Sequence, residues 1–365
     1  MKNTFGNNVT VTLFGESHGE YIGAVLDGLA PGIRIDEEYI KAKLALRRPV
    51  GAISTARVEA DEYTIASGVY NGFTTGSPLC ILIPNTNKKS ADYSDRMDIP
   101  RPGHADFTAN EKYHGFADHR GGGHFSGRIT AALVAAGAIV GSALNTKGIK
   151  IGSHITELHG AFDRPFEEYE SDIDLVNSRQ FPALSDEAEL RMKKEIEKAK
   201  EKGDSVGGIL ESAIIGLPSG LGEPWFDSIE SMLSHGLFSI PGVKGVEFGI
   251  GFAFCDTYGS EANDPFRVEN GKIVTETNNN GGINGGITNG MPVTFRTVIK
   301  PTPSISMTQG SVSLSKMENV SLKVGGRHDP CIVHRARAVV DAVAAIVVAD
   351  MLSARYGTDY LATKE

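Results

Sequence analysis

The sequence predicts an α+β fold in which central helices are covered by β-sheet. Two long runs, at residues 129–144 and 336–354, are rich in alanine, glycine and valine and carry few charges, as in helices buried on all sides. Strand-like runs stand before, between and after them, so sheets are expected to cover them. A chain of 365 residues can form two or three domain-sized units or one large intertwined unit. No repeat or low-complexity linker is present, so a clean domain boundary cannot be located from the sequence pattern.

Strands are predicted where short alternating or apolar runs stand between glycines, prolines and polar residues. The clearest alternation is at residues 8–14, and the runs 64–66 and 79–83 are joined through a glycine-containing segment at 72–76. Further strands are predicted at residues 150–157, 207–216, 243–256, 272–276 and 292–299. These runs supply the sheets that the two buried helices require.

Two more helices are predicted outside the central pair. Asp36 is a favourable N-cap, and the run 36–47 ends at Arg47 with Arg48 directly after it; arginines suit a helix C-terminus. Residues 186–202 are charged throughout with little apolar face, which predicts a solvent-facing helix. Residues 160–185 show no clear period. We therefore expect a surface insertion around residues 160–205.

The overall composition narrows the class of protein. A net charge of −9 argues against binding to nucleic acid or to a membrane surface, so an anionic ligand would need a local arginine cluster. The cysteines Cys80, Cys255 and Cys331 are far apart and lack zinc spacing, as expected for reduced thiols in a cytoplasmic protein. The first residues have no long apolar run and do not predict a signal peptide. The uncharged stretch at 129–146 nearly reaches the length of a membrane span, but its small residues favour a buried core helix.

Two of the ten histidines stand in glycine-containing turns with an acidic neighbour. His18 lies in Gly-Glu-Ser-His-Gly directly after the first strand, and His104 lies in Arg-Pro-Gly-His-Ala-Asp. Imidazole titrates near neutral pH, so beside arginines it indicates acid–base chemistry on an anionic substrate. Asp106 could then orient the ring of His104. In the alternative interpretation, His18 is hydrogen-bonded within its own loop and the second motif is a structural turn.

Several other segments could bind an anion. Arg47 and Arg48 either complement a helix dipole or grip a phosphate or carboxylate in bidentate fashion. The loop at 118–128 contains three successive glycines before a predicted helix, where free backbone N–H groups can bind anions. Lys300 and the hydroxyls after it could hold a phosphate, or could end an edge strand in a proline turn. The segment 325–331 forms a turn before the last helix and could also face a ligand.

The irregular stretch at 84–126 is long and rich in chemically active side chains, which favours a functional loop. It does not match the Walker loop or the dinucleotide-binding glycine pattern. His114, His119 and His124 are five residues apart, a spacing that argues against a metal site. Glycine, with 43 residues, often occurs in pairs, which indicates either backbone contact with a flat or phosphorylated ligand or ordinary turns.

Six motifs occur in an order that resembles the chorismate synthase family. They are Gly-Glu-Ser-His-Gly at 15–19, Arg-Pro-Gly-His-Ala-Asp at 101–106, the triple glycine leading into Ser-x-Arg-x-Thr at 121–130, Gly-Leu-Gly-Glu-Pro at 220–224, Lys-Pro-x-Pro-Ser at 300–304 and Gly-Arg-His-Asp-Pro-Cys at 326–331. Each motif alone is a weak signal, but six in this order are specific. The resemblance extends over about residues 5–355.

This resemblance implies a carbon–oxygen lyase that converts 5-enolpyruvylshikimate 3-phosphate to chorismate and inorganic phosphate, the last shared step of aromatic amino-acid biosynthesis by the shikimate pathway. The reaction is an anti-1,4-elimination that requires reduced FMN without net redox change. In the family, the flavin transiently donates an electron to help phosphate leave, and its N5 takes the C6 proton. The resemblance also implies a single domain over residues 1–365, central helices between antiparallel sheets and a cytoplasmic homotetramer.

The resemblance assigns roles to individual residues. His18 corresponds to the histidine that protonates the departing phosphate, His104 to the one that keeps the reduced flavin protonated, and Asp329 to the aspartate that assists proton removal. The arginines around substrate and flavin correspond to Arg47, Arg48, Arg101, Arg128 and Arg327. The flavin contacts correspond to His124, Phe125, Ser126, Pro241, Gly242, Gly285, Lys300, Pro301, Thr302, Pro303, Ser304 and Arg327.

Two segments depart from the family pattern. After the triple glycine the family commonly reads Arg-x-Ser-Ala-Arg-Glu-Thr, whereas residues 124–130 lack one arginine and the glutamate. The family also has an arginine soon after Arg-Arg-Pro; residues 50–55 have none, and Arg57 is a candidate replacement. A flavin reductase that uses the same FMN site and a catalytically silent FMN- or phosphate-binding module remain alternative hypotheses. The sequence leaves open whether the chain reduces its own flavin with NADPH.

Overall fold

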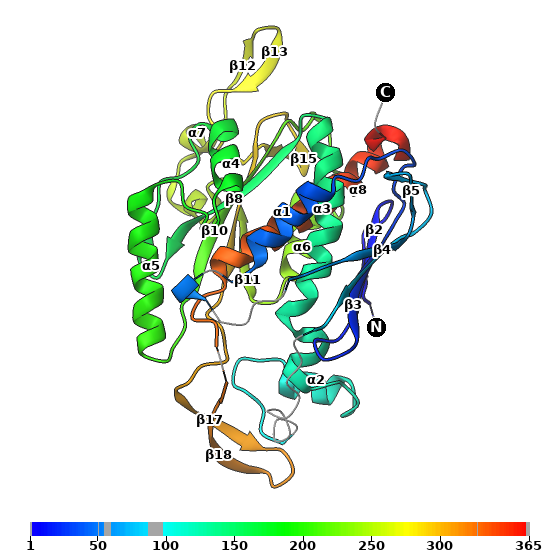
Figure 1. Ribbon diagram of the computed structural model, residues 1–365. Coiled ribbons are helices and arrows are strands. Elements are labelled where there is room, and N and C mark those ends of the chain that lie inside the picture. The colour runs from blue at the N-terminus through cyan, green and yellow to red at the C-terminus, as the bar shows by residue number, and fades with distance from the viewer. Residues whose placement is uncertain (1, 50, 55–59, 87–97, 327, 363–365) are drawn as a thin grey trace.

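The computed structural model describes residues 2–49, 51–54, 60–86, 98–326 and 328–362. Two five-stranded antiparallel sheets enclose the helices α3 (Thr130–Thr146) and α8 (Val333–Tyr356), as predicted (Figure 1). Helix α3 packs on the first sheet and on α8, and α8 packs on the second sheet. This arrangement is the predicted α+β sandwich.

Small residues let the two central helices approach each other closely. A Cβ atom placed on Gly137 of α3 would lie 2.4 Å from the Cβ of Ala342 in α8, so glycine is needed at this crossing. By length and composition Gly127–Thr146 could cross a membrane, yet 78% of its apolar window is buried inside the protein. The buried position accounts for its apolar composition, as expected for a core helix.

The first sheet has the order β1-β2-β3-β7-β4. Its strands are β1 (Thr4–Phe5), β2 (Thr10–Gly15), β3 (Tyr21–Asp27), β7 (Leu79–Pro84) and β4 (Thr64–Ser67). The structure confirms the strands predicted at 8–14, 64–66 and 79–83, but the sequence interpretation missed β3. The segment predicted to join β4 and β7 forms a small hairpin of β5 (Val69–Tyr70) and β6 (Phe73–Thr74).

The second sheet has the order β11-β16-β10-β8-β9. Its strands are β11 (Val243–Phe248), β16 (Val293–Ile299), β10 (Gly208–Ile215), β8 (Lys150–Leu158) and β9 (Ala161–Phe162). The prediction of one strand over residues 243–256 was wrong beyond Phe248. Gly249 and Gly251 adopt positive φ, and Glu247 accepts a hydrogen bond from the backbone N–H of Phe252, so the chain turns into a short 3-10 helix, η5 (Gly251–Asp256).

Helices α4 (Tyr169–Ser178) and α5 (Asp186–Glu201) lie on the outer side of the second sheet (Figure 1). The expectation that α5 has little apolar face was wrong, because a narrow stripe of it is buried. The stripe consists of Ala188, Met192, Ile196 and Ala199. Helix α4, in the segment without clear period, buries Ile173 and Val176 in a small second core. That residues 160–205 are an insertion stays a prediction.

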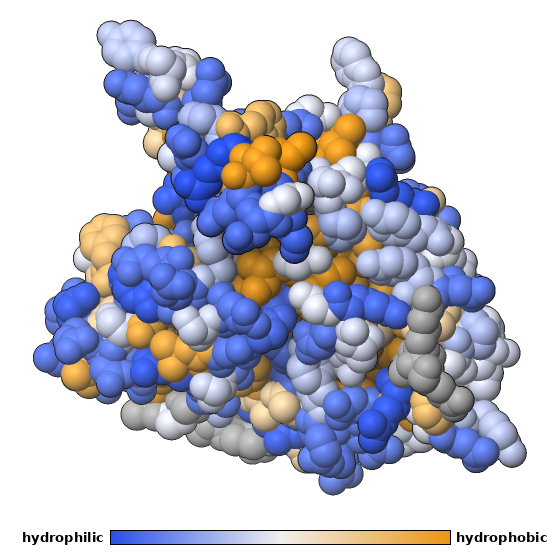
Figure 2. All heavy atoms as spheres, turned by 90° about the horizontal axis from the view of Figure 1, so that it is seen from above, coloured by the Kyte–Doolittle hydropathy of each residue, from blue (hydrophilic) through white to orange (hydrophobic). Residues whose placement is uncertain are grey.

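The remaining elements are short or project from the body. They are η1 (Gly51–Ile53), α2 (Asp106–Lys112), η3 (Arg120–Phe125), η4 (Gly127–Ile129), α6 (Ile229–Phe238), α7 (Gly259–Ala262), β12 (Phe266–Glu269), β13 (Lys272–Thr275), β14 (Ile283–Asn284), β15 (Ile287–Thr288), β17 (Thr308–Ser313), β18 (Glu318–Lys323) and η6 (Thr358–Leu361). The hairpins β12–β13 and β17–β18 extend from opposite ends of the molecule (Figure 1). Seen from above, the surface is mainly hydrophilic, with hydrophobic side chains in scattered patches (Figure 2).

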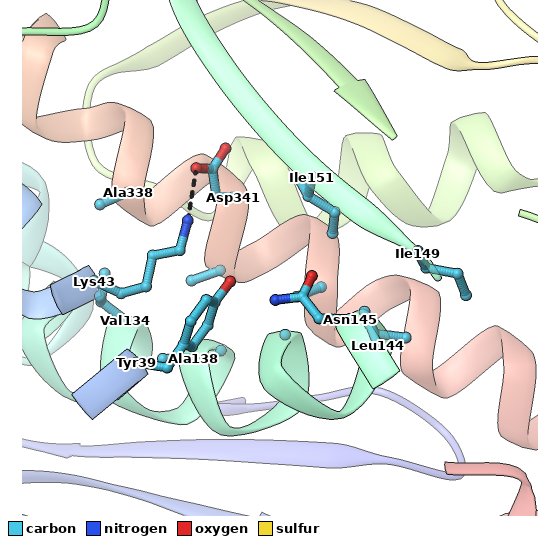
Figure 3. A pocket seen from close by; sticks show the side chains of 14 residues that line it. Tyr39, Lys43, Val134, Ala138, Leu144, Asn145, Ile149, Ile151, Ala338 and Asp341 are labelled. Atoms are coloured by element: carbon cyan, nitrogen blue, oxygen red, sulfur yellow. Dashed lines mark ion pairs between the residues drawn. The ribbon is translucent and has the colours of Figure 1, made fainter. Parts of the chain in front are cut away.

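Helix α1 (Glu37–Arg47) is fixed to the core by a buried polar cluster (Figure 3). Asp36 caps it as predicted, because its carboxylate accepts the N–H of Tyr39 at 2.9 Å. Lys43 lies 3.9 Å from Asp341 of α8 and donates to Asn177 at 2.7 Å. Such a buried pair favours one position of α1 over others. Helix α1 ends at Arg47, so this cluster also fixes where that arginine stands.

Candidate active site

A cleft of about 690 Å³ gathers most of the predicted site residues. It is bordered by the end of α1, the loop before α2, the glycine loop before α3, the turn between α6 and β11, the segment after β16 and the start of α8. The predicted residues that line it are Arg47, Arg48, Arg101, His104, Phe125, Ser126, Arg128, Pro241, Gly242, Lys300, Pro301, Thr302, Pro303, Ser304 and Asp329. These residues are far apart in sequence, and the sandwich brings them together.

His18 lies directly behind the wall of this cleft. Its ring is only 4% exposed, and its Nδ1 lies 3.4 Å from the Oγ of Ser17. The cleft wall in front of it is Gly121, where an added Cβ would lie 2.4 Å from Cε1 of His18. At the next residue, Gly122, an added Cβ would lie 3.3 Å from Cε1 of His104. Consecutive glycines with positive φ therefore bring both imidazoles to one turn.

His104 belongs to a charged cluster at the start of α2. Arg101 donates to Asp106 from Nε and from Nη2, both at 2.7 Å. The Nδ1 of His104 lies 2.7 Å from Asp106 Oδ1 and 3.0 Å from Arg101 Nη2. Burial tends to raise the pKa of Asp106, but the hydrogen bonds from Arg101 and His104 outweigh it and hold that pKa well below its usual value. The ionised Asp106 is placed to orient His104, as the sequence suggested, and it also orients Arg101.

Replacing Asp106 by asparagine is expected to lower the free energy of unfolding at pH 7 by about 1.5–3 kcal/mol, because Arg101 loses a bidentate charged partner. The pKa of Asp106 is depressed in the folded state, so the stabilisation is complete above the ordinary carboxyl pKa and declines as pH falls toward the folded-state pKa. Urea unfolding of both proteins from pH 7 to about pH 2 should show a difference that is constant near neutral pH and narrows below about pH 4. A difference independent of pH would contradict the assignment of the effect to this carboxylate.

Two buried residues of the site were missed by sequence reasoning. Asp61, which is 4% exposed, accepts hydrogen bonds from Arg47 at 2.9 Å and from Arg128. Asn85, directly after β7, accepts from Arg128 at 3.1 Å and donates to the carbonyls of residues 16 and 19 in the turn that carries His18. A lone Asp and a lone Asn carry no local signal of this kind. Their function follows from the neighbours that the fold supplies.

The opposite wall carries the segment after β16. Lys300 donates to the carbonyl of Gly103, and burial together with the charge of Lys244 lowers the pKa of Lys300. The Oγ of Ser304 accepts a hydrogen bond from Arg101 at 3.2 Å. The hydroxyl of Thr302 is buried and has no hydrogen-bond partner within the described residues. This segment therefore offers an ammonium and hydroxyl groups to the cleft.

The start of α8 forms a third part of the wall. Asp329 is ion-paired with Arg335, a cleft residue that the sequence interpretation did not select. Arg335 also donates to the carbonyl of Arg47 at 2.7 Å and so joins α8 to the end of α1. Asp329 lines the cleft as expected, and its carboxylate is held on one side by this arginine.

Two predicted flavin contacts, His124 and Gly285, are not brought to the cleft of this chain. The Nδ1 of His124 lies 2.7 Å from the carbonyl of Gly15, so that ring faces the end of β2. Gly285 lies in the turn between β14 and β15. The next residue, Gly286, accepts a hydrogen bond through its carbonyl from the backbone N–H of Ile229, the first residue of α6. Only the other end of α6 reaches the cleft. Arg327, like Arg57 and residues 50 and 55, lies outside the described residues.

The arrangement concentrates positive charge in an acidic protein. Four arginines predicted from the sequence and Lys300 line a space that also contains the imidazole of His104. Guanidinium groups bind phosphate and carboxylate, and an oriented imidazole can move protons. Within the described ranges, no group of three His, Cys, Asp or Glu residues is arranged to hold a metal ion. The fold and the cleft together have the groups that an enzyme would need for acid–base chemistry on small anionic ligands.

Comparison with known proteins identifies the family. The sequence profile described as chorismate synthase matches residues 9–353. Chorismate synthases of Thermococcus gammatolerans and Thermococcus kodakarensis are 48% and 45% identical to this chain, and each alignment covers 96% of this chain and 97% of the relative. A crystal structure of chorismate synthase has a TM-score of 0.75 at 28% identity and covers 97% of this chain and 94% of that chain. The chain belongs to the chorismate synthase family, and both the predicted resemblance and the predicted fold class are confirmed.

Proposed function

We propose that this enzyme converts 5-enolpyruvylshikimate 3-phosphate to chorismate and inorganic phosphate by anti-1,4-elimination, with reduced FMN as an obligatory cofactor and without net redox change. The observation that carries the proposal is the convergence of Arg47, Arg48, Arg101 and Arg128 on one cleft with His104. The substrate carries a phosphate and two carboxylates, and FMN adds a further phosphate. A protein with net charge −9 needs such a local cluster to hold them.

The cleft fits FMN together with a substrate. Its volume of about 690 Å³ is in the range of ligand and cofactor sites. Phe125, Ile240 and Ile332 offer apolar surface to a flat ring. Lys300 and the buried hydroxyl of Thr302, which has no hydrogen-bond partner within the described residues, can hold a phosphate or ribityl oxygens. When bound, reduced FMN supplies the electron density that makes phosphate a better leaving group.

The chain's own residues bind the substrate and move protons. Arg47, Arg48 and Arg128 hold anionic groups of the substrate, and Arg101 holds one beside His104. His18 gives its proton to the departing phosphate across the Gly121 turn. His104, oriented by Asp106, keeps the cofactor in its protonated form, and Asp329 assists removal of the C6 proton. Each of these roles rests on family correspondence together with the position of the residue in or directly behind the cleft.

Replacing Arg128 by lysine is expected to lower kcat/KM by about 10–100-fold, although the charge is kept. Arg128 donates in three directions, to Asn85 at 3.1 Å, to the carbonyl of Pro84 at 3.2 Å and to Asp61. A single ammonium cannot make this fork of bonds. Steady-state kinetics with reduced FMN test the prediction, with Arg267→Lys on the exposed β12–β13 hairpin as the matched control. Equal activity of wild type and Arg128→Lys would remove Arg128 from the site.

The alternative of a flavin reductase is separated from the lyase by one anaerobic experiment. The protein is mixed with chemically reduced FMN and 5-enolpyruvylshikimate 3-phosphate, and chorismate absorbance, free phosphate and reductant are followed. A lyase releases chorismate and phosphate in equal amounts without consuming reductant. A reductase consumes reductant stoichiometrically, and a silent binding module releases neither product. Turnover driven by NADPH alone would add self-reduction of the flavin to the proposal.

We further propose a cytoplasmic homotetramer, as the family resemblance implies. Large hydrophobic side chains are exposed on several elements outside the cleft, including Trp225, Phe252 and Phe266. In a tetramer, some of these side chains would be buried between subunits. Light scattering of the purified protein tests the proposal, and a monomer would refute it.

A further inference from the structure

An acidic residue stands among the cationic groups of a cleft proposed to bind anions. Asp61 lines the cleft, is 4% exposed and adopts φ of 51°, a left-handed conformation that is uncommon for residues other than glycine. Burial tends to raise its pKa, but the charges of Arg47 and Arg128 outweigh this effect and lower it, so the carboxylate is ionised. By Coulomb's law a negative charge here weakens the binding of an anionic ligand. Its presence therefore calls for another explanation.

The contacts of Asp61 provide that explanation. Its Oδ2 accepts from Arg47 at 2.9 Å, and its Oδ1 accepts from Arg128, so one carboxylate joins two arginines from different elements. Arg47 ends α1, whereas Arg128 lies in η4 immediately before α3. The preceding residue, Ala60, accepts a hydrogen bond from Arg48 through its carbonyl. Residues 60 and 61 together hold three of the cleft arginines.

Arg47 depends on Asp61 more than Arg128 does. Arg128 is also fixed by Asn85 and by the carbonyl of Pro84. The Nε of Arg47 is buried and has no hydrogen-bond partner within the described residues. A long side chain without such a bond keeps more rotamer freedom, which a ligand would have to remove on binding.

We propose that Asp61 is a positioning residue that holds Arg47 and Arg128 at a fixed separation, so that both guanidinium groups face one anionic group of the ligand. The proposal deepens the proposed function and rests on it for the identity of the ligand. The gain from preorganised arginines exceeds the repulsion between Asp61 and the anion. The proposal therefore predicts the direction in which ligand affinity changes when the charge of Asp61 is removed.

The decisive measurement is the affinity of Asp61→Asn for inorganic phosphate and for 5-enolpyruvylshikimate 3-phosphate, by isothermal titration calorimetry. If Asp61 acts only through its charge, removing that negative charge lowers the Kd of both anionic ligands. We expect the opposite, with Kd raised about tenfold or more for the substrate, because the two arginines are no longer held together. Tighter or unchanged binding of both ligands overturns the proposal.

A second variant and a matched control separate positioning from stability. Asp61→Glu keeps the charge but moves the carboxylate by one methylene, so affinity falls if position matters and is unchanged if charge alone matters. Asp172→Asn is the control, because Asp172 is also a buried carboxylate that accepts two bonds from an arginine, Arg164 at 2.8 and 2.6 Å, but lies outside the cleft. We expect Asp172→Asn to lose stability without a change in Kd.

The kinetic signature is also specific. Because the arginines hold the substrate equally in ground state and transition state, Asp61→Asn should raise KM about tenfold and lower kcat by less. In the Asp61→Asn background, Arg128→Lys should lower kcat/KM by a smaller factor than in the wild type, because the carboxylate that Arg128 contacts is already absent. Additive effects of the two substitutions contradict the proposal. If the wild type failed to release chorismate, the proposed function would fall, while the phosphate affinities would still decide the role of Asp61.

Discussion

Replacing His18 by alanine is expected to lower turnover of 5-enolpyruvylshikimate 3-phosphate by about 10²–10⁴-fold, the usual contribution of a positioned general acid. His18 lies in the turn after β2, and its ring is next to Gly121 of the cleft wall. Without it, the departing phosphate must take its proton from water. Single-turnover kinetics with reduced FMN measure the effect on the chemical step directly.

The matched control is His114→Ala, which removes an exposed imidazole that does not line the cleft. Its turnover should equal that of the wild type. The circular dichroism spectrum of His18→Ala should also match the wild type, so that the loss is chemical and not structural. Wild-type turnover in His18→Ala would remove His18 from the mechanism and leave the proton source unassigned.

A comparable loss, about 10²-fold, is expected when Gly121 is replaced by alanine, although no ionisable group changes. The added methyl would lie 2.4 Å from Cε1 and 2.6 Å from Nδ1 of His18, far inside van der Waals contact. The backbone at Gly121 also has φ of 62°, which an L side chain rarely adopts. Either the imidazole or the loop must move, and a small displacement of a catalytic group can lower turnover strongly.

Gly259→Ala provides the control for this substitution, because a Cβ there meets nothing within 4 Å and the residue lies in α7. It should behave as the wild type in turnover and in thermal unfolding. Crystallography of Gly121→Ala should show a displaced His18 ring or a displaced glycine loop. Full activity with an undisturbed ring would mean that the turn does not position the acid.

The elements that were predictable are those whose signal is local. The apolar composition of α3 and α8 indicates that they are buried on all sides, and the N-cap residue Asp36 marks where α1 begins. Helix α5 was misjudged because long charged side chains mask a stripe of four small or medium apolar residues. The end of β11 was misplaced because the two glycines that break it precede a run of apolar residues that reads as strand.

The residues of the candidate site also fall into those that the sequence predicted and those that it did not. The residues in short motifs, such as His104 beside Arg101 and Asp106, were predictable because their partners lie a few positions away. Asp61 and Asn85 were not, because their partners come from other elements and only the folded chain brings them near. Gly285 was predicted from family correspondence, and in this chain it lies at the far end of α6. Sequence reasoning selected most of the motif residues that line the cleft but not the residues that brace it.

The cleft draws its walls from both ends of the chain, from Arg47 after the first strands to Arg335 in the last long helix. During synthesis on the ribosome, the nascent chain therefore cannot complete this space until α8 has emerged and docked between the sheets. Ligands that need all of the walls can stabilise only the finished molecule. Truncated or stalled products would gain nothing from cofactor or substrate, which leaves them more exposed to proteolysis than the full-length enzyme.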